Sequence, residues 1–180
     1  MDQGIINRYG FNSDGADVVL DRLEKLRSEG ELPGVLIVNL GKNKTAEAIP
    51  DYVYGVKKFK DVADMMVVNI SSPNTPGLRN LQGKKELTNL MSAVVKTRNA
   101  ECPKTPLLVK IAPDLTDTEL KDVCNVVMST KVCFVIMSSL KMECVLSNAE
   151  KTCVTWSYPP RCVSFECVQN VFSIDRMRYL

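Results

Sequence analysis

Three polar side chains at the ends of apolar runs are the first candidates for chemistry in this sequence. Two runs close on Asn39 and Asn69, and a third contains Lys110. If these runs are parallel strands, their carboxyl ends lie at one edge of a sheet, where ligands of α/β proteins bind. Two amides and one cation would suit a planar heterocycle that carries carbonyl and N–H groups. An asparagine at a strand end is, however, about as often a turn former.

The segment NISSPNTPGLRNLQG, Asn69 to Gly83, is a second candidate because it places many polar and turn-forming residues directly after a buried run. Pro73 favours an extended conformation at Ser72, which would fix the direction of its hydroxyl group. Further along, a turn is predicted at Asn74, Pro76 and Gly77. The segment is therefore either a polar loop over the mouth of a strand or an ordinary surface loop.

Four short apolar runs predict the strands that would position these residues. Each is rich in Val, Ile, Leu or Met without clean alternation, as expected for strands buried on both faces of a parallel sheet. The runs are Val35–Asn39, Met65–Ile70, Leu107–Ile111 and Val132–Met137.

Helical patterns separate the four runs. In Lys84–Asn99 the apolar residues recur on one helical face, namely Leu87, Leu90, Met91, Val94 and Val95. Thr116 to Glu119 matches a capping box, which predicts a helix whose inner face is Leu120, Val123, Cys124 and Val127. Weaker helical candidates are Asp51–Phe59 and Asp14–Arg27, the latter preceded by Asn12 and Ser13 as candidate N-caps.

The alternation of strands and helices predicts βαβ units and a parallel sheet. Both a doubly wound sheet and a (β/α)8 barrel satisfy this pattern. A complete barrel takes about 250 residues. The four βα units here would be about half of one.

Composition excludes several classes of function. The 180 residues are 45% hydrophobic and 24% charged, which is typical of a soluble globular domain. The net charge of +2 gives no electrostatic case for nucleic acid, and the absence of histidine excludes histidine bases and metal ligands. The seven cysteines include no C-x-x-C pair, so reduced thiols are expected, without a metal site. No run of about 20 apolar residues is present, so the protein is expected to be soluble or to lack its targeting segment.

Four motifs resemble consecutive motifs of the class 2, quinone-linked dihydroorotate dehydrogenases. They occur in the order and at the spacing of that family, and together they cover about Ile6 to Met137. The motifs are INRYGFNSDG (Ile6–Gly15), VNLGKNK (Val38–Lys44), VVNISSPNTPGLRNLQG (Val67–Gly83) and LVKIAPDLT (Leu108–Thr116).

The resemblance implies an FMN-binding (β/α)8 TIM barrel that oxidises dihydroorotate to orotate in pyrimidine (UMP) biosynthesis. Class 1 relatives carry a cysteine where this chain has Ser72, so the resemblance favours the class that passes electrons to ubiquinone. Eukaryotic members of that class lie at the mitochondrial inner membrane, and bacterial members at the cytoplasmic membrane. A segment that is missing here would provide the membrane association.

The resemblance also implies roles for individual residues. Ser72 matches the catalytic base, which takes a proton from C5 of dihydroorotate while a hydride leaves C6 for flavin N5. The residues that match cofactor ligands are Asn39, Asn69 and Lys110. The residues that match the substrate site are Asn7, Arg8, Tyr9, Gly10, Phe11, Asn69, Ile70, Ser71, Ser72, Pro73 and Asn74.

The resemblance stops near residue 138. The family continues with a Thr-Asn pair after the corresponding strand, whereas this chain has Ser138 and Ser139, and the glycine-rich segments that hold the FMN phosphate do not follow. We therefore expect a partial barrel domain over residues 1–137 and a divergent, irregular tail over residues 138–180.

An incomplete barrel would leave strand edges exposed and would remove the anchor of the FMN phosphate. The sequence thus predicts an inactive fragment or truncated isoform that binds FMN weakly or not at all. Two alternatives stay open: a non-catalytic half-barrel that associates with another chain through its open edges, and another flavin barrel that acts on pyrimidines.

Overall fold

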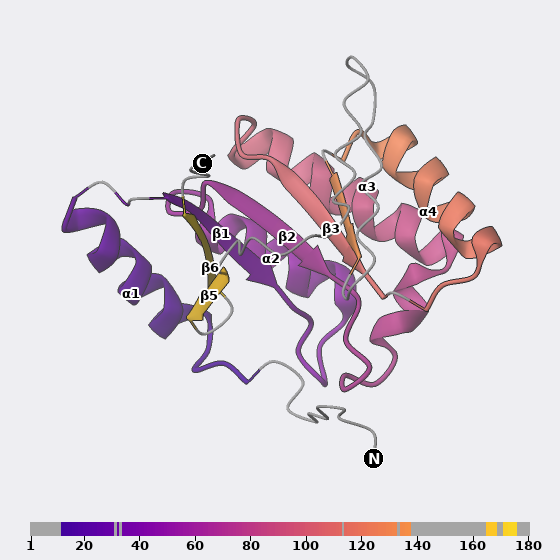
Figure 1. Ribbon diagram of the computed structural model, residues 1–180, viewed down its shortest axis with the longest axis horizontal. Helices are drawn as coiled ribbons and strands as arrows, with labels where there is room; N and C mark the ends of the chain where they lie inside the picture. The colour runs from indigo at the N-terminus through magenta and orange to yellow at the C-terminus, as the bar shows by residue number, and fades with distance from the viewer. Residues whose placement is uncertain are drawn as a thin grey trace, which may run out of the picture.

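A six-stranded sheet forms the centre of the molecule (Figure 1). The computed structural model describes residues 12–30, 32, 34–112 and 114–132, and the backbone of residues 134–137, 165–168 and 171–175. Four strands run parallel in the order β4-β3-β2-β1. They are β1 (Gly34–Leu40), β2 (Met65–Asn69), β3 (Leu107–Ile111) and β4 (Phe134–Met137). All four lie at the apolar runs from which strands were predicted.

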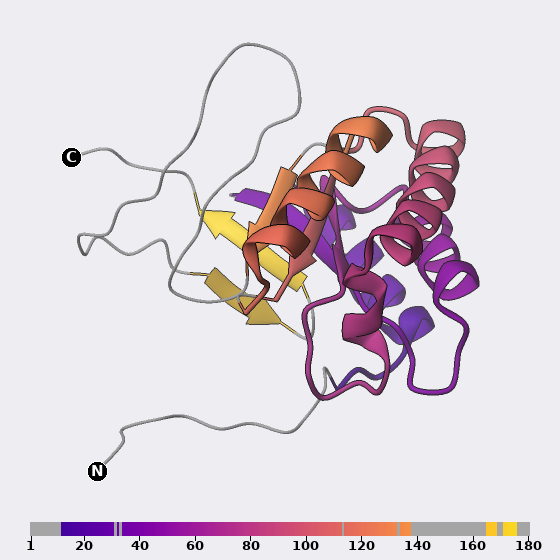
Figure 2. The ribbon, with the colours of Figure 1, turned by 90° about the vertical axis from the view of Figure 1, so that its right-hand side faces the viewer.

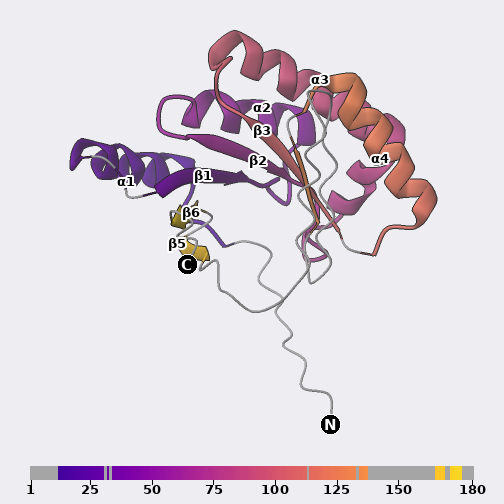
Figure 3. The same ribbon diagram turned by 45° about the horizontal axis from the view of Figure 1, so that its top comes forward.

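Four helices pack on one face of this sheet. They are α1 (Ala16–Ser28), α2 (Ala48–Phe59), α3 (Lys84–Glu101) and α4 (Asp117–Thr130). Figures 2 and 3 show α2, α3 and α4 on the same side of the parallel strands. A doubly wound sheet carries helices on both faces, whereas a barrel carries them only on the outside. Among the described residues, the arrangement is therefore that of a barrel segment, and the prediction of a partial (β/α)8 barrel is confirmed.

Alternation along the strands separates two apolar clusters. The larger lies on the helix side and includes Leu36, Val38, Leu40, Met66, Val68, Ile70, Leu107, Val109 and Ile111. The smaller lies on the opposite side, which we call the inner face, and is formed by Ile37, Val67 and Leu108 with Val35 and Met65 packed against them. Because successive side chains of a strand point to opposite faces, alternate residues of each strand belong to opposite clusters.

The predicted helices are all present, with small differences in detail. α3 buries the five predicted apolar residues and also Arg98, whose guanidinium group donates to the carbonyl oxygen of Thr105. The capping box at Thr116 and Glu119 is confirmed. The core face of α4 contains Val126 rather than Cys124, which is only partly buried. α1 begins after Gly15, and the Ser13 hydroxyl accepts from the Gly15 amide instead of capping the helix itself.

Within the segment expected to be irregular, the described residues form a hairpin of two strands. β6 (Val171–Asp175) pairs antiparallel with β1, and β5 (Phe165–Val168) pairs antiparallel with β6. An unpaired edge strand offers its amides and carbonyls to any other chain. In this chain β6 occupies the edge of β1, so association through that edge is closed. The division into two parts at residue 137 stays a prediction.

Candidate active site

The three polar residues at the strand ends lie on the inner face of the sheet. Val38 and Leu40, on either side of Asn39, belong to the helix-side cluster. The same is true of Val68 and Ile70 around Asn69, and of Val109 and Ile111 around Lys110. By alternation, all three polar side chains therefore point away from the helices. In a barrel that face lines the interior, and the carboxyl ends of the strands form the ligand-binding mouth.

The amides of Asn39 and Asn69 contact each other directly. Asn69 Nδ2 donates to Asn39 Oδ1 at 3.1 Å. Both residues are buried, with exposures of 0% for Asn69 and 7% for Asn39. Lys110 is the direct neighbour of Asn69 across the β2–β3 ladder, and the Ile70 amide donates to the Lys110 carbonyl oxygen at 3.0 Å. The structure thus places two amide side chains and a lysine on one face of three neighbouring strands.

Asn69 is held in place by a buried hydrogen-bond network. Its Oδ1 accepts from the Ser71 amide at 3.1 Å and from the Ser71 hydroxyl at 2.8 Å. Its carbonyl oxygen accepts from the Tyr52 hydroxyl of α2 at 2.7 Å. Burial raises the pKa of Tyr52 well above its ordinary value, with a smaller contribution from Asp51, so the hydroxyl keeps the proton that it donates. The side chain of Asn69 therefore has one defined orientation.

Ser72 lies in the loop that follows, and it is buried with 5% exposure. Its Oγ accepts a hydrogen bond from the Asn74 amide at 3.2 Å. An N–H donor to a hydroxyl oxygen stabilises negative charge on that oxygen and so favours loss of the hydroxyl proton. The predicted turn is also present: the Leu78 amide donates to the Thr75 carbonyl oxygen, and Gly77 has a φ of 71° as a type II turn requires.

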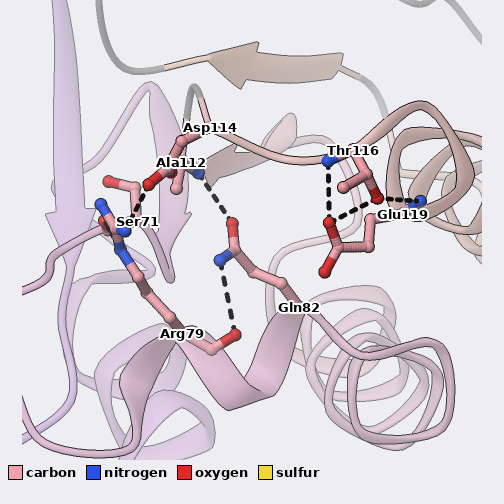
Figure 4. Close-up of polar contacts among 7 residues, drawn as sticks. All are labelled: Ser71, Arg79, Gln82, Ala112, Asp114, Thr116 and Glu119. Atoms are coloured by element: carbon pink, nitrogen blue, oxygen red, sulfur yellow. Dashed lines mark hydrogen bonds and ion pairs between the residues drawn. The ribbon is translucent and has the colours of Figure 1, made fainter.

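A short 3-10 helix, η1 (Leu78–Gln82), follows this loop in the chain. Its side chains contact both this loop and the segment after β3. Figure 4 shows Arg79 and Gln82 reaching from η1 towards Ser71, Ala112 and Asp114. Sequence reasoning did not single out these two residues or Tyr52. Their partners are far away in sequence, so no local pattern marks them.

The predicted site residues are distributed unevenly. Asn7, Arg8, Tyr9, Gly10 and Phe11 lie outside the residues that the structure describes. Ser71 and Ser72 are buried beside Asn69, whereas Asn74 is partly exposed and Pro73 exposed. The side chain of Ile70 belongs to the helix-side core, so only its backbone can contact a ligand on the inner face.

The described segment has the architecture of α/β barrels that bind a ligand at the carboxyl ends of their strands. Comparison with known proteins defines the family. The model of the dihydroorotate dehydrogenase family matches residues 1–154. The chain therefore belongs to the dihydroorotate dehydrogenase family.

Several relatives are similar over most of the chain. The mitochondrial quinone dihydroorotate dehydrogenase of Lachancea kluyveri is 44% identical over 158 aligned residues, covering 73% of this chain and 35% of the relative. The quinone dihydroorotate dehydrogenase of Xanthobacter autotrophicus is 47% identical over 136, covering 73% and 38%. The crystal structure of the Eimeria tenella enzyme with ferulenol is 40% identical, with a TM-score of 0.66 and coverage of 73% and 41%.

The chain thus spans a little over a third of the length of the curated relatives it matches. Among the described residues, no helix has the length and apolar character needed to cross a bilayer. In the same part of the chain, no cluster of acidic or cysteine side chains could hold a metal ion.

Proposed function

We propose that this chain carries the central part of the flavin and substrate site of a quinone-linked dihydroorotate dehydrogenase. The reaction is the oxidation of dihydroorotate to orotate in pyrimidine biosynthesis, with a quinone as the final electron acceptor. One observation carries the proposal: Asn39, Asn69 and Lys110 share one face of three adjacent strands, and Ser72 follows Asn69 by three residues.

The residues present fit FMN by the chemistry of their donors and acceptors. Asparagine amides both donate and accept, which suits the carbonyl and N–H groups on the pyrimidine edge of a flavin. A lysine cation beside them would stabilise the negative charge that builds up there on reduction. FMN, when bound, supplies the acceptor for the hydride that leaves C6 of dihydroorotate. Asn39 and Lys110 are the proposed flavin ligands, and Asn69 lies between them.

Ser72 is the proposed base that takes the proton from C5 of dihydroorotate. A serine hydroxyl is a weak base, so its surroundings must help it. Two features of this chain support that role: the Asn74 amide that donates to Ser72 Oγ, and the exclusion of water by burial. Asn74 is the proposed ligand of the substrate amide, and the Asn69–Ser71 network fixes the backbone directly before Ser72.

The proposed partners and location follow from the relatives. Several of them are named quinone dihydroorotate dehydrogenases, and those from Lachancea kluyveri, Candida glabrata and Schizosaccharomyces pombe are named mitochondrial. Ubiquinone as electron acceptor and the mitochondrial inner membrane as location are therefore the proposed assignments. The relatives from Xanthobacter autotrophicus and Rhodospirillum rubrum, which have similar identity, are also named quinone dihydroorotate dehydrogenases and support the same reaction.

Titration of the 180-residue chain with FMN, followed by flavin fluorescence and absorbance, tests the proposal. We expect weak, saturable binding of FMN. Lys110→Met should weaken FMN binding by about ten-fold, since a lost charge-assisted hydrogen bond of about 1.5 kcal/mol corresponds to that factor.

Lys121→Met is the matched control, because Lys121 is exposed on α4. Equal loss of affinity in both variants, or no saturable binding by the wild type, would contradict the proposed site. Stoichiometric binding, with one FMN retained per purified chain, would instead contradict the expectation that the cofactor site is incomplete.

A further inference from the structure

We propose that Gln82 and Arg79 are positioning residues, which clamp the loop that carries Ser72 to the segment that follows Lys110. The inference rests on the proposed function, since it concerns how Ser72, the proposed base, and Lys110, a proposed flavin ligand, keep a fixed position relative to each other. Its physical basis is independent of any ligand. It lies in the contacts that η1 makes where the β2–β3 ladder ends.

The ladder between β2 and β3 ends at the amide of Ile70, which donates to the carbonyl oxygen of Lys110 at 3.0 Å. Beyond this point the two chain segments separate into loops. The next amide on the β3 side that needs a partner is that of Ala112, which is fully buried. A buried amide without an acceptor is costly, so something other than a strand must supply one.

Gln82 supplies that acceptor. Its Oε1 accepts from the Ala112 amide at 2.7 Å, although the two residues are 30 positions apart in sequence. Its Nε2 contacts the Arg79 carbonyl oxygen at 3.4 Å, which orients the side-chain amide within η1. Gln82 is itself buried, at 5% exposure, so the contact is shielded from water. The glutamine side chain thus takes the position that a neighbouring strand would occupy two residues after Lys110.

Arg79 makes the second contact of the clamp. Its Nε donates to the Ser71 carbonyl oxygen at 3.2 Å, directly before Ser72, and its Nη1 pairs with Asp114 Oδ2 at 2.8 Å (Figure 4). The planar guanidinium group serves the two partners from two different nitrogens held in a fixed fork, a geometry that the single nitrogen of a lysine does not reproduce. The ion pair is partly exposed, with side-chain exposures of 37% and 61%, so salt screens it. Gln82 therefore carries most of the coupling, and Arg79 sets the direction of the loop.

Amide hydrogen exchange of the full chain without ligands tests the clamp. Gln82→Met keeps the shape of the side chain but removes the acceptor, whereas Gln82→Glu keeps an acceptor for the Ala112 amide. We expect Gln82→Met to raise exchange about ten-fold or more at Ala112 and in Ser71–Thr75, with β1 and α2 unchanged. Gln82→Glu should restore most of the protection, and Arg79→Lys should raise exchange in Ser71–Thr75 by a smaller factor.

Lys84→Ala is the matched control. It removes the ion pair between Lys84, at the start of α3, and Asp122 of α4, neither of which belongs to the two loops. If Gln82→Met raised exchange uniformly across the sheet, Gln82 would be an ordinary core residue and the clamp would be overturned. Unchanged exchange at both loops would overturn it as well.

Orotate binding to the FMN-saturated chain provides the second readout. Gln82→Met should weaken orotate binding by about ten-fold and FMN binding by much less, because the loop that carries Ser72 and Asn74 loses its position. Equal weakening of both ligands would overturn the positioning role. If the wild type bound neither FMN nor orotate, the proposed function would fail, while the exchange result would still decide whether the clamp exists.

Discussion

The loops after β2 and β3 are neighbours in space, and both are held by polar side chains, yet they differ in how they are built. After β2, the polar groups of Asn69, Ser71 and Gln82 are buried, and their partners are Asn39, Tyr52 and Ala112. After β3, the side chains of Thr116 and Glu119 bond to each other and to each other's backbone amides within one helical turn, and both residues are exposed.

The difference separates a local structure from a site. A capping box stabilises the helix in which it occurs and needs no other part of the fold. The network around Asn69 exists only when two strands, a helix and η1 are assembled, so its geometry depends on the whole segment. Buried polar groups of this kind are costly unless every partner is in place. Such a network is expected where a fixed arrangement of polar atoms is needed for binding.

Asn69→Ala is the substitution expected to have the largest effect on this comparison. It removes the acceptor for the Ser71 amide and hydroxyl and the donor to Asn39, and so leaves buried polar groups without partners. We expect the free energy of unfolding to fall by about 3 kcal/mol, measured by urea denaturation. Asn80→Ala, an exposed position in η1, should change it by less than about 0.5 kcal/mol. Similar losses in both variants would show that the network is not a special source of stability.

The sequence predicted the framework well because the strands and helices follow from periodic patterns. The four apolar runs and the Lys84–Asn99 stripe correspond to observed elements, and the capping box is present where the motif occurs. The β5–β6 hairpin was not predicted. Its segment lacks clear periodicity, and β6 gains its hydrogen bonds from the edge of β1, which lies more than 130 residues earlier in the chain.

The geometry of the candidate site was predicted only in part, for a related reason. The sequence could place Asn39, Asn69 and Lys110 at one edge of the sheet because the register of neighbouring parallel strands and the alternation of side chains along them are regular. The residues that orient them could not. Tyr52 appears in the sequence as one more apolar position of a helix, and Gln82 as one polar residue of a turn. Their role depends on which buried atom lies opposite, and that is decided by tertiary packing.

Tyr52→Phe sharpens the comparison by removing a single hydroxyl group. The Asn69 carbonyl oxygen would lose its donor in a buried environment, while the packing of the ring would stay the same. We expect a loss of about 1–2 kcal/mol in the free energy of unfolding. Tyr54→Phe on the same helix is the control, because Tyr54 is 48% exposed and its change should be close to zero.

The difference in stability between the wild type and Tyr52→Phe should depend on pH, and its sign follows from the pKa of Tyr52. Burial, and then Asp51, raise this pKa above the ordinary value of 10.0. Stability from Tyr52 is therefore fully present below that ordinary value and is lost as the pH rises above it, because the unfolded state ionises first. From about pH 9 to about pH 11 the wild type should lose stability more steeply than Tyr52→Phe, by up to about 1.4 kcal/mol per pH unit. Parallel curves would contradict the buried, protonated hydroxyl.

The smallest effect is expected on the local side of the comparison, at Glu119. Hydrogen bonds from the Thr116 hydroxyl and amide to the Glu119 carboxylate lower its pKa from the ordinary value of 4.5. The stability from this contact is present above that value and is lost as the pH falls through the lowered pKa. Glu119→Gln keeps an acceptor but cannot titrate, so its deficit relative to the wild type should shrink between neutral pH and about pH 3. Glu24→Gln, at an exposed position of α1, is the charge-matched control in the same urea denaturation series. A deficit of Glu119→Gln that stayed constant across this range would mean that protonated Glu119 caps α4 as well as the Glu119 carboxylate does. The charge of the box would then contribute nothing, and even this local motif would depend on geometry alone.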